Sequence, residues 1–146
     1  MFINFINLWW FSCIRKNFIM NDLIIKGIKT AFFTPTVEFI VSTGKCSIKG
    51  EAHLEDTVEF FQPLYDWLYE YIDKVKKQII FEINLTYFNT RASRSIFDML
   101  FILRKYVDSG ATVTVNWYCD KDDQDMLDEI DDYLEDTGLE INRIIY

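Results

Sequence analysis

The spacing of apolar and polar residues changes its period along the chain, and each change marks a predicted element. Runs rich in β-branched and aromatic residues predict strands. These strands cover residues 23–28, 34–43, 45–51, 78–88, 111–118 and 139–145. Gly44 separates the second run from the third, and the two are predicted to form a hairpin in which Val37, Phe39 and Val41 share one face.

A repeat of three to four residues predicts a helix that begins near Glu55. Its apolar stripe comprises Val58, Phe61, Tyr65, Leu68, Ile72 and Val75. A second stripe on the same helix comprises Phe60, Leu64, Trp67 and Tyr71. Most of these residues are expected to be buried against neighbouring elements, with some left to contact a partner. Pro63 falls inside the helix, so we expect a short first turn and then a kink or a restart.

Two further helices have the same spacing. The first is marked by Ile96, Met99, Leu100, Leu103 and Val107, and the second by Met126, Leu127, Ile130, Tyr133 and Leu134. They are predicted to end at Gly110 and Gly138, which suit helix C-termini. Helices that alternate with strands after an opening hairpin indicate an α/β fold in a single domain. We expect a mixed, mostly parallel sheet with three main helices packed against it.

Composition and charge then narrow the function. Half of the 146 residues are hydrophobic and 17% are aromatic, which favours a folded protein over a disordered one. The formal net charge of −8 disfavours nucleic acid and anionic membrane surfaces as partners, because both are bound through Lys and Arg. The cysteines at 13, 46 and 119 form neither a C-x-x-C pair nor a disulfide framework, a pattern that suits a reducing cytoplasm.

Residues 1–19 differ in character from the rest of the chain. Their apolar stretch is too short and too interrupted for a membrane span. Arg15 and Lys16 follow the apolar stretch, whereas a secretory signal has its positive charge first. The segment is either an interfacial anchor rich in Phe and Trp or an extension that precedes the true start at Met20. We favour the second interpretation, which leaves residues 20–146 as the domain, because the domain pattern does not need the extension.

The sequence gives no positive sign of an enzyme, a metal site or a cofactor. It lacks a glycine-rich phosphate loop and the motifs G-x-S-x-G and H-E-x-x-H. Its one histidine, His53, is expected in a polar turn before the first helix. Residues 120–131 resemble an EF-hand loop, but Asp125 replaces the required glycine and Asp131 the bidentate Glu. We predict a solvated acidic helix face; an enzyme or metal protein built on His53 and this face would require tight calcium or zinc binding.

The junction between the fourth predicted strand and the second helix carries the most specific chemistry. Asn89 and Thr90 both suit the helix N-cap, because their side-chain oxygens can accept from its free amides. A phosphate on Thr90 would be stabilised by the same amides, and Arg91 and Arg94 are near enough in sequence to pair with it. The residues alone leave two interpretations open, a structural cap or a phosphorylation switch.

Five blocks of this sequence resemble the SiaC family of bacterial regulatory phosphoproteins. The blocks are TPTVEF, GKCSIKGE, FFQPLYDWLYEY, FEINLTYFNT and VTVNWYCDKDDQDM. The resemblance covers residues 23–146, and its most specific part is the Tyr-Phe-Asn-Thr junction. It implies a fold like the STAS domain of anti-sigma-factor antagonists and a regulator that is not an enzyme.

The resemblance also implies a mechanism. The phosphoacceptor would be Thr90, with Tyr87, Phe88 and Asn89 leading into it. A dedicated protein kinase would phosphorylate this threonine, and a PP2C-like phosphatase would remove the phosphate. The unphosphorylated form would bind and stimulate a diguanylate cyclase in cyclic di-GMP signalling that controls biofilm behaviour. Our own hypothesis is that the contact surface is the start of the second helix, with part of the aromatic side of the first.

The chain departs from the family pattern directly after the threonine. Arg91 and Ala92 stand where two serines are expected, and Arg94 takes the usual lysine position. Ser93 lies close enough to compete as an acceptor, so the departure bears on kinase recognition and on the identity of the output protein. We predict a cytoplasmic regulatory phosphoprotein switched at Thr90. The alternative is a scaffold or interaction domain without a switch, in which Thr90 is a cap.

Overall fold

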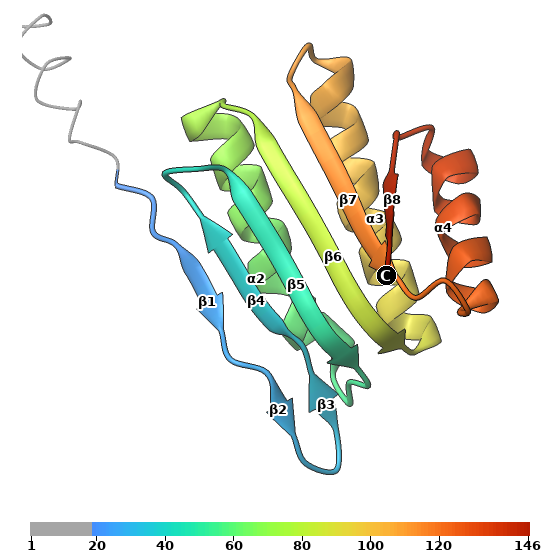
Figure 1. Cartoon of the computed structure of the whole chain (residues 1–146). Coiled ribbons are helices and arrows are strands. Elements are labelled where there is room, and N and C mark those ends of the chain that lie inside the picture. The colour runs from blue at the N-terminus through green and yellow to red at the C-terminus, as the bar shows by residue number, and fades with distance from the viewer. Residues whose placement is uncertain (1–18) are drawn as a thin grey trace, which may run out of the picture.

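The structure, a computed structural model, describes residues 19–146, so the predictions for residues 1–18 lie outside its scope. The described residues form a six-stranded sheet with three α-helices and a separate two-stranded hairpin (Figure 1). The strands are β1 (Leu23–Ile25), β2 (Ile28–Lys29), β3 (Phe33–Thr34), β4 (Thr36–Ile40), β5 (Lys45–Ala52), β6 (Ile79–Phe88), β7 (Val113–Cys119) and β8 (Asn142–Ile145). The helices are α2 (Thr57–Glu70), which continues as the π-helix η1 (Tyr71–Val75), α3 (Thr90–Asp108) and α4 (Gln124–Thr137).

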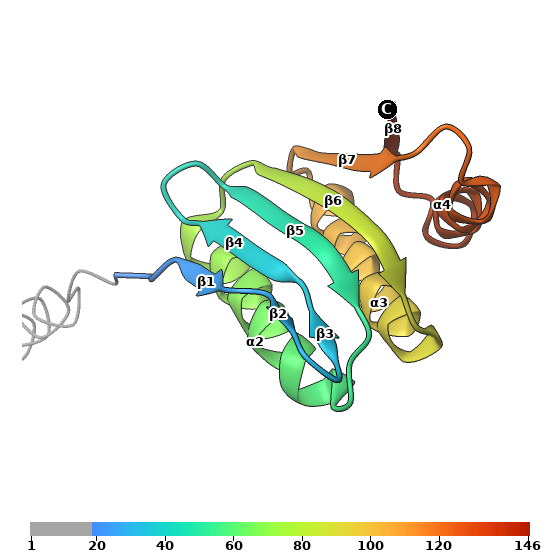
Figure 2. The ribbon, with the colours of Figure 1, turned by 60° about the horizontal axis from the view of Figure 1, so that its bottom comes forward.

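The sheet has the order β1-β4-β5-β6-β7-β8. The pairs β1–β4 and β4–β5 are antiparallel, and the three pairs from β5 to β8 are parallel. Each parallel connection carries a helix, and the helices lie on one face of the sheet (Figure 2). Within residues 19–146, no helix lies over the opposite face. The predicted α/β fold, with a mixed and mostly parallel sheet and three helices, is therefore confirmed.

The strand β6 shows how the sequence pattern sets the core. Its residues Ile79, Phe81, Ile83 and Leu85 are buried, while the residues between them are partly exposed. This alternation places one side of the strand under the helices and the other on the uncovered face. The long β-branched and aromatic run predicted here is confirmed as a central strand, and it carries the chain directly into the start of α3.

The opening hairpin also follows the sequence. Ile40 pairs with Lys45, and Gly44 takes a left-handed conformation with φ +70° at the turn between them. A glycine suits this position because a side chain there would be strained and would meet the carbonyl of Gln78. The predicted strand over 23–28 is split, since β1 ends at Ile25 and β2 begins at Ile28 to form the small hairpin with β3.

Two predictions for the first helix are wrong. The predicted restart of the helix at Pro63 is wrong, because α2 runs unbroken from Thr57 to Glu70. Pro63 and Glu59 are both exposed, so water can satisfy the carbonyl that lacks a helical donor. Val58 is 74% exposed, although its spacing placed it on the buried stripe. The buried face is centred between the two predicted stripes, and at about 100° per residue Val58 lies at its margin.

The core residues of α2 confirm that most of its aromatic side is structural. Phe61, Leu64, Leu68 and Tyr71 are almost completely buried. The Tyr71 hydroxyl donates to the carbonyl of Gln78 at 3.1 Å, which ties the end of the helix to the start of β6. Of the helices in the described part of the chain, none has the length and apolar character needed to cross a membrane.

Candidate functional site

Asn89 fixes the junction between β6 and α3. Its side-chain oxygen accepts from the amide of Ala92 at 2.9 Å, which caps the helix. Its backbone amide donates to Ala52 at 3.1 Å, and its side-chain amide donates to the carbonyl of Leu54 at 3.4 Å. The start of α3 is thereby fastened to the end of β5 and to the segment that follows it.

Thr90 is the first residue of α3, and it is exposed. Across residues 19–146, no hydrogen bond involves its hydroxyl. Asn89 and Thr90 are both residue types that suit a helix N-cap, and in the structure Asn89 is the N-cap. The interpretation of Thr90 as the cap is therefore wrong, because its side chain makes no bond to the helix amides. Its hydroxyl lies open to solvent at the N-terminal end of the helix.

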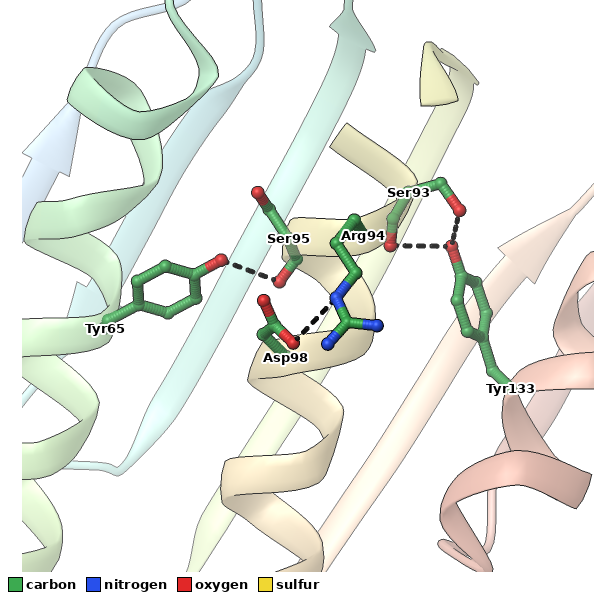
Figure 3. A network of polar contacts seen from close by, with 6 residues as sticks. All are labelled: Tyr65, Ser93, Arg94, Ser95, Asp98 and Tyr133. Atoms are coloured by element: carbon green, nitrogen blue, oxygen red, sulfur yellow. Dashed lines mark hydrogen bonds and ion pairs between the residues drawn. The ribbon is translucent and has the colours of Figure 1, made fainter. Parts of the chain in front are cut away.

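The two arginines after Thr90 differ in their contacts. Arg91 is exposed, and within the described residues it has no ion-pair partner. Arg94 forms an ion pair with Asp98, with Nε 3.3 Å from the carboxylate oxygen (Figure 3). Its guanidinium also lies over the ring of Phe97, 5.1 Å from the centroid. Arg94 therefore reaches along the helix toward its C-terminus and away from Thr90.

Ser93 is half-buried, and its side chain contacts α4. Its hydroxyl donates to a carboxylate oxygen of Glu129 at 2.7 Å and lies 2.7 Å from the hydroxyl of Tyr133. Tyr133 also lies within hydrogen-bond distance of the Ser93 carbonyl, at 3.1 Å (Figure 3). The Ser93 hydroxyl is thus part of the contact between two helices, whereas the hydroxyl of Thr90 is not.

Burial is the main cause that raises the pKa of Tyr133 above its ordinary value. The hydrogen bond with Ser93 lowers this pKa by less than burial raises it, and the nearby Glu129 carboxylate raises it further. The Tyr133 hydroxyl therefore stays protonated at neutral pH and remains available as a hydrogen-bond donor to Ser93.

The second turn of α3 is also held from the side of α2. The hydroxyl of Tyr65 donates to the carbonyl of Ser95 at 3.2 Å (Figure 3). Contacts through Asn89, Ser93 and Ser95 therefore hold the start of α3 against three different parts of the fold. Among the described residues, none of these contacts lies on the outward side of the helix, where Phe97 is half-buried and the residues Thr90 and Arg94 are exposed. This side carries Thr90, Arg94, Phe97 and Phe101, which share a face at helical spacing, and we call these four residues the outer stripe.

Tyr87 and Phe88, the residues that lead into the site, have different environments. Tyr87 is 49% exposed, and its ring centroid lies 6.1 Å from that of His53. Phe88 is half-buried, and its ring lies 6.1 Å from that of Trp117 in the core. Both line an open depression of about 290 Å³ toward the start of α4, whose other lining includes Asp123 and Glu129. Of this pair, Tyr87 is the more accessible to a partner.

His53 and the acidic stretch have structural contacts of their own. His53 is not in a free polar turn as predicted, because its backbone forms a two-bond bridge with Phe33. Asp123 caps α4 by accepting from the amide of Met126 at 3.0 Å, and Asp120 accepts from the amide of Asp122 at 2.8 Å. Over residues 19–146, no three His, Cys, Asp or Glu side chains cluster as metal ligands would.

Three residues around the site were missed by sequence reasoning. The ion pair of Asp98 with Arg94 could have been predicted from the sequence, because residues four positions apart face each other on a helix. The contacts of Glu129 and Tyr133 with Ser93 could not have been predicted from local sequence, since the two residues lie 36 and 40 positions further along the chain. Only the packing of α4 beside α3 brings them together.

The fold and the site define a small α/β protein with a single exposed threonine at the start of a helix that packs on a mostly parallel sheet. Residues 28–146 match the family described as SiaC family regulatory phosphoprotein. The chain therefore belongs to the SiaC family, as its sequence blocks predicted. An uncharacterized protein of Pseudomonas aeruginosa strain UCBPP-PA14 is 24% identical over 120 residues, which cover 82% of this chain and 93% of that protein.

Solved structures from the same organism have a similar fold. SiaC of Pseudomonas aeruginosa superposes with a TM-score of 0.78 at 21% sequence identity, over 87% of this chain and all of that chain. A chain of the crystal structure of the diguanylate cyclase SiaD in complex with its activator SiaC gives a TM-score of 0.76 at 20% identity. This match covers 84% of the present chain and all of the other. At these identities the similarity establishes the fold.

Proposed function

We propose that this protein is a non-enzymatic cytoplasmic regulator whose domain spans residues 20–146 and whose switch is the reversible phosphorylation of Thr90. A protein kinase adds the phosphate and a PP2C-like phosphatase removes it. The unphosphorylated form binds an output protein, which we propose to be a diguanylate cyclase of cyclic di-GMP signalling and biofilm control. Membership of the SiaC family and the complex formed by SiaC and SiaD of Pseudomonas aeruginosa support this partner.

One observation carries the proposal. Thr90 presents an exposed hydroxyl without a hydrogen bond from the described residues, directly after the side chain that caps the helix. A kinase can reach such a hydroxyl without unfolding the helix start. The competing acceptor, Ser93, already donates to Glu129 and contacts Tyr133. Its phosphorylation would first require the contact between α3 and α4 to open.

The switch would act through charge and desolvation. A phosphate on Thr90 adds about 1.5 to 2 negative charges at neutral pH. An interface that accommodates a neutral hydroxyl would have to bury this group, which costs binding free energy unless the partner supplies cations. We propose that the partner contacts the start of α3, including Asn89 and Arg91, together with the exposed Tyr87 beside it.

The free cysteines support a reducing location. Cys46 and Cys119 are both buried and unpaired, and they pack as small apolar side chains. A protein without disulfides at these positions suits the cytoplasm, where thiols stay reduced. The same compartment contains the nucleotide substrates that a cyclase would use.

The direct test is phosphopeptide mass spectrometry of the protein from its own cells, over residues 78–104. We expect phosphate on Thr90 in at least one growth condition. Finding Thr90 bare in every condition, with phosphate on Ser93 or nowhere, would contradict the proposal and favour a scaffold or interaction domain without a switch.

Partner binding gives the second test. We expect Thr90→Ala to keep its binding to the output protein and Thr90→Asp to lose at least tenfold in affinity. Ser42→Asp is a matched control, because it makes the same change of charge at an exposed residue in the turn between β4 and β5, at the opposite end of the sheet. Equal binding by all three variants would show that the charge of residue 90 does not control the partner.

A further inference from the structure

Arg94, a residue of the outer stripe, lies between Asp98 and Thr90, and Thr90 would become a second acidic partner when phosphorylated. It follows Thr90 by four residues and precedes Asp98 by four, so each of these positions faces it on the helix surface. At present it pairs with Asp98 at 3.3 Å and covers the ring of Phe97. A phosphate on Thr90 would place a second acceptor on the opposite side of the same guanidinium.

The aromatic part of the outer stripe is held together by cations. The rings of Phe97 and Phe101 stack with centroids 6.2 Å apart and planes 9° apart. Arg94 lies over Phe97, and Lys105 lies over Phe101 with its ammonium 4.8 Å from the centroid. Phe101 is 43% exposed, so this stack is a part of the surface that a partner can contact. A movement of Arg94 would uncover one end of the stack.

The order of the charges along the helix favours such a movement. On a helix, an acidic residue pairs better with a cation four residues after it than with one four residues before it, an order that also suits the helix dipole. The present pair has the less favourable order, because Asp98 follows Arg94. Phosphorylated Thr90 would have the favourable order, with up to two negative charges in place of one.

We propose that Arg94 is the residue that transmits the state of Thr90 to the partner surface. When Thr90 is free, Arg94 pairs with Asp98 and covers Phe97. When Thr90 is phosphorylated, Arg94 pairs with the phosphate, Asp98 loses its partner and the Phe97 ring is uncovered. This inference rests on the proposed phosphorylation of Thr90. Phosphorylation would then change the contacts of Arg94 and Phe97 on the outer stripe as well as the charge of Thr90.

Arginine is suited to this exchange in a way that lysine is not. Its planar guanidinium can bind two phosphate oxygens at once and can also stack on an aromatic ring. A lysine at this position would act as a point charge without the same bidentate pairing. Arg94→Lys should therefore keep part of the phosphate pairing, and Arg94→Gln should lose it.

The test uses the full chain with phosphothreonine installed at position 90 by chemical ligation or genetic encoding. The second pKa of the phosphate is followed by phosphorus NMR in the parent protein, in Arg94→Gln and in Lys105→Gln. Pairing with Arg94 favours the dianion, so we expect Arg94→Gln to raise this pKa by about 0.3 relative to the parent. Lys105→Gln removes the same charge from the far end of α3 and should leave it unchanged.

The second readout follows the side chains directly. In nitrogen-edited NMR spectra, phosphorylation should shift the Nε–H signal of Arg94, and it should shift the ring signals of Phe97 in the same sample. Because Arg94 is 74% exposed, its variants are expected to fold. An unchanged phosphate pKa in Arg94→Gln would overturn the inference. The same would follow if Arg91→Gln, and not Arg94→Gln, produced the rise.

This test is independent of the proposed function. The phosphate is installed without the natural kinase, so a chain that is never phosphorylated in its cells would still report whether Arg94 pairs with it. A phosphorylated chain in which Arg94 keeps its contact with Asp98 would leave the switch at Thr90 intact and would remove only the transmission along the stripe.

Discussion

The hydroxyl oxygens of Ser93 and Tyr133 lie 2.7 Å apart, and this contact joins α3 to α4 just beyond the candidate switch. The Ser93 hydrogen is directed to Glu129, and the Tyr133 hydroxyl lies near both the hydroxyl and the carbonyl of Ser93. One serine thus bonds through its side chain and its backbone to the neighbouring helix. This is why two hydroxyl residues only three positions apart have different roles, one structural and the other accessible.

Tyr133→Phe tests the structural role of this contact. Removing the hydroxyl leaves the Ser93 carbonyl without this donor, so we expect a loss of about 1 kcal/mol in the free energy of unfolding. Urea denaturation measures it. Tyr118→Phe is a matched control, because its half-exposed hydroxyl makes no hydrogen bond to the described residues. Equal stabilities of the two variants would contradict the assignment.

Asn89→Ala and Thr90→Ala separate the cap from the switch. We expect Asn89→Ala to lose about 1–2 kcal/mol of unfolding free energy, because both the cap and the bond to Leu54 disappear. Thr90→Ala should cost nothing or stabilise slightly, since alanine has the higher helix propensity and no hydrogen bond is lost. Thermal and urea unfolding at neutral pH would measure both. A larger loss in Thr90→Ala than in Asn89→Ala would reverse the assignment.

Gly44→Ala tests the hairpin turn. Gly44 has φ +70°, and an added methyl group would meet the Gln78 carbonyl and the Tyr71 hydroxyl. Strain and overlap together should lower the free energy of unfolding by about 3 kcal/mol. Gly110 has φ +100° with no atom near the added methyl group, so Gly110→Ala should show the strain alone, about 1 kcal/mol. Similar losses would contradict the close approach at Gly44.

Stability should fall at alkaline pH. Burial raises the pKa of the Cys46 thiol and of the Tyr133 hydroxyl, so the folded state holds these protons more tightly than the unfolded state. Their contribution is complete below the ordinary pKa values, about 8.5 for cysteine and about 10 for tyrosine, and decreases as the pH rises above them. We expect the urea midpoint to decrease progressively from about pH 8.5.

Cys46→Ala provides the control for that pH dependence. This substitution removes a fully buried thiol, so the decrease of the urea midpoint that begins near the ordinary cysteine pKa should become shallower. The further decrease caused by the tyrosines at higher pH should remain. A midpoint that stays constant up to pH 10.5 in the parent protein would contradict the assignment of these buried groups.

Local patterns in the sequence predicted most of the fold. The order of elements from β4 onward, the turn at Gly44 and the end of α4 at Gly138 depend on residues that are near one another in the chain, and all three are confirmed. The burial of Val58 and the restart of the helix at Pro63 were predicted incorrectly. Both depend on which side of the helix faces the sheet, and spacing alone could not decide between two apolar stripes.

The candidate site was only partly predictable for the same reason. The sequence placed Asn89 and Thr90 at the helix start, but residue types could not tell which of them bonds to the amides. That choice follows from the second bond of Asn89, to the carbonyl of Leu54. Leu54 lies 35 residues earlier in the chain and reaches the site only through the parallel pairing of β5 with β6.

The cap at Asn89 has an evolutionary consequence. Because the bonds that start α3 come from the residue before Thr90, the exposed side chains that follow it, such as Arg91 and Arg94, can change without loss of the helix start. A kinase selects its target by such flanking residues. Related proteins could therefore become targets of different kinases while the fold stays the same. After a gene duplication, a few surface substitutions could be enough to separate the two copies into different signalling pathways.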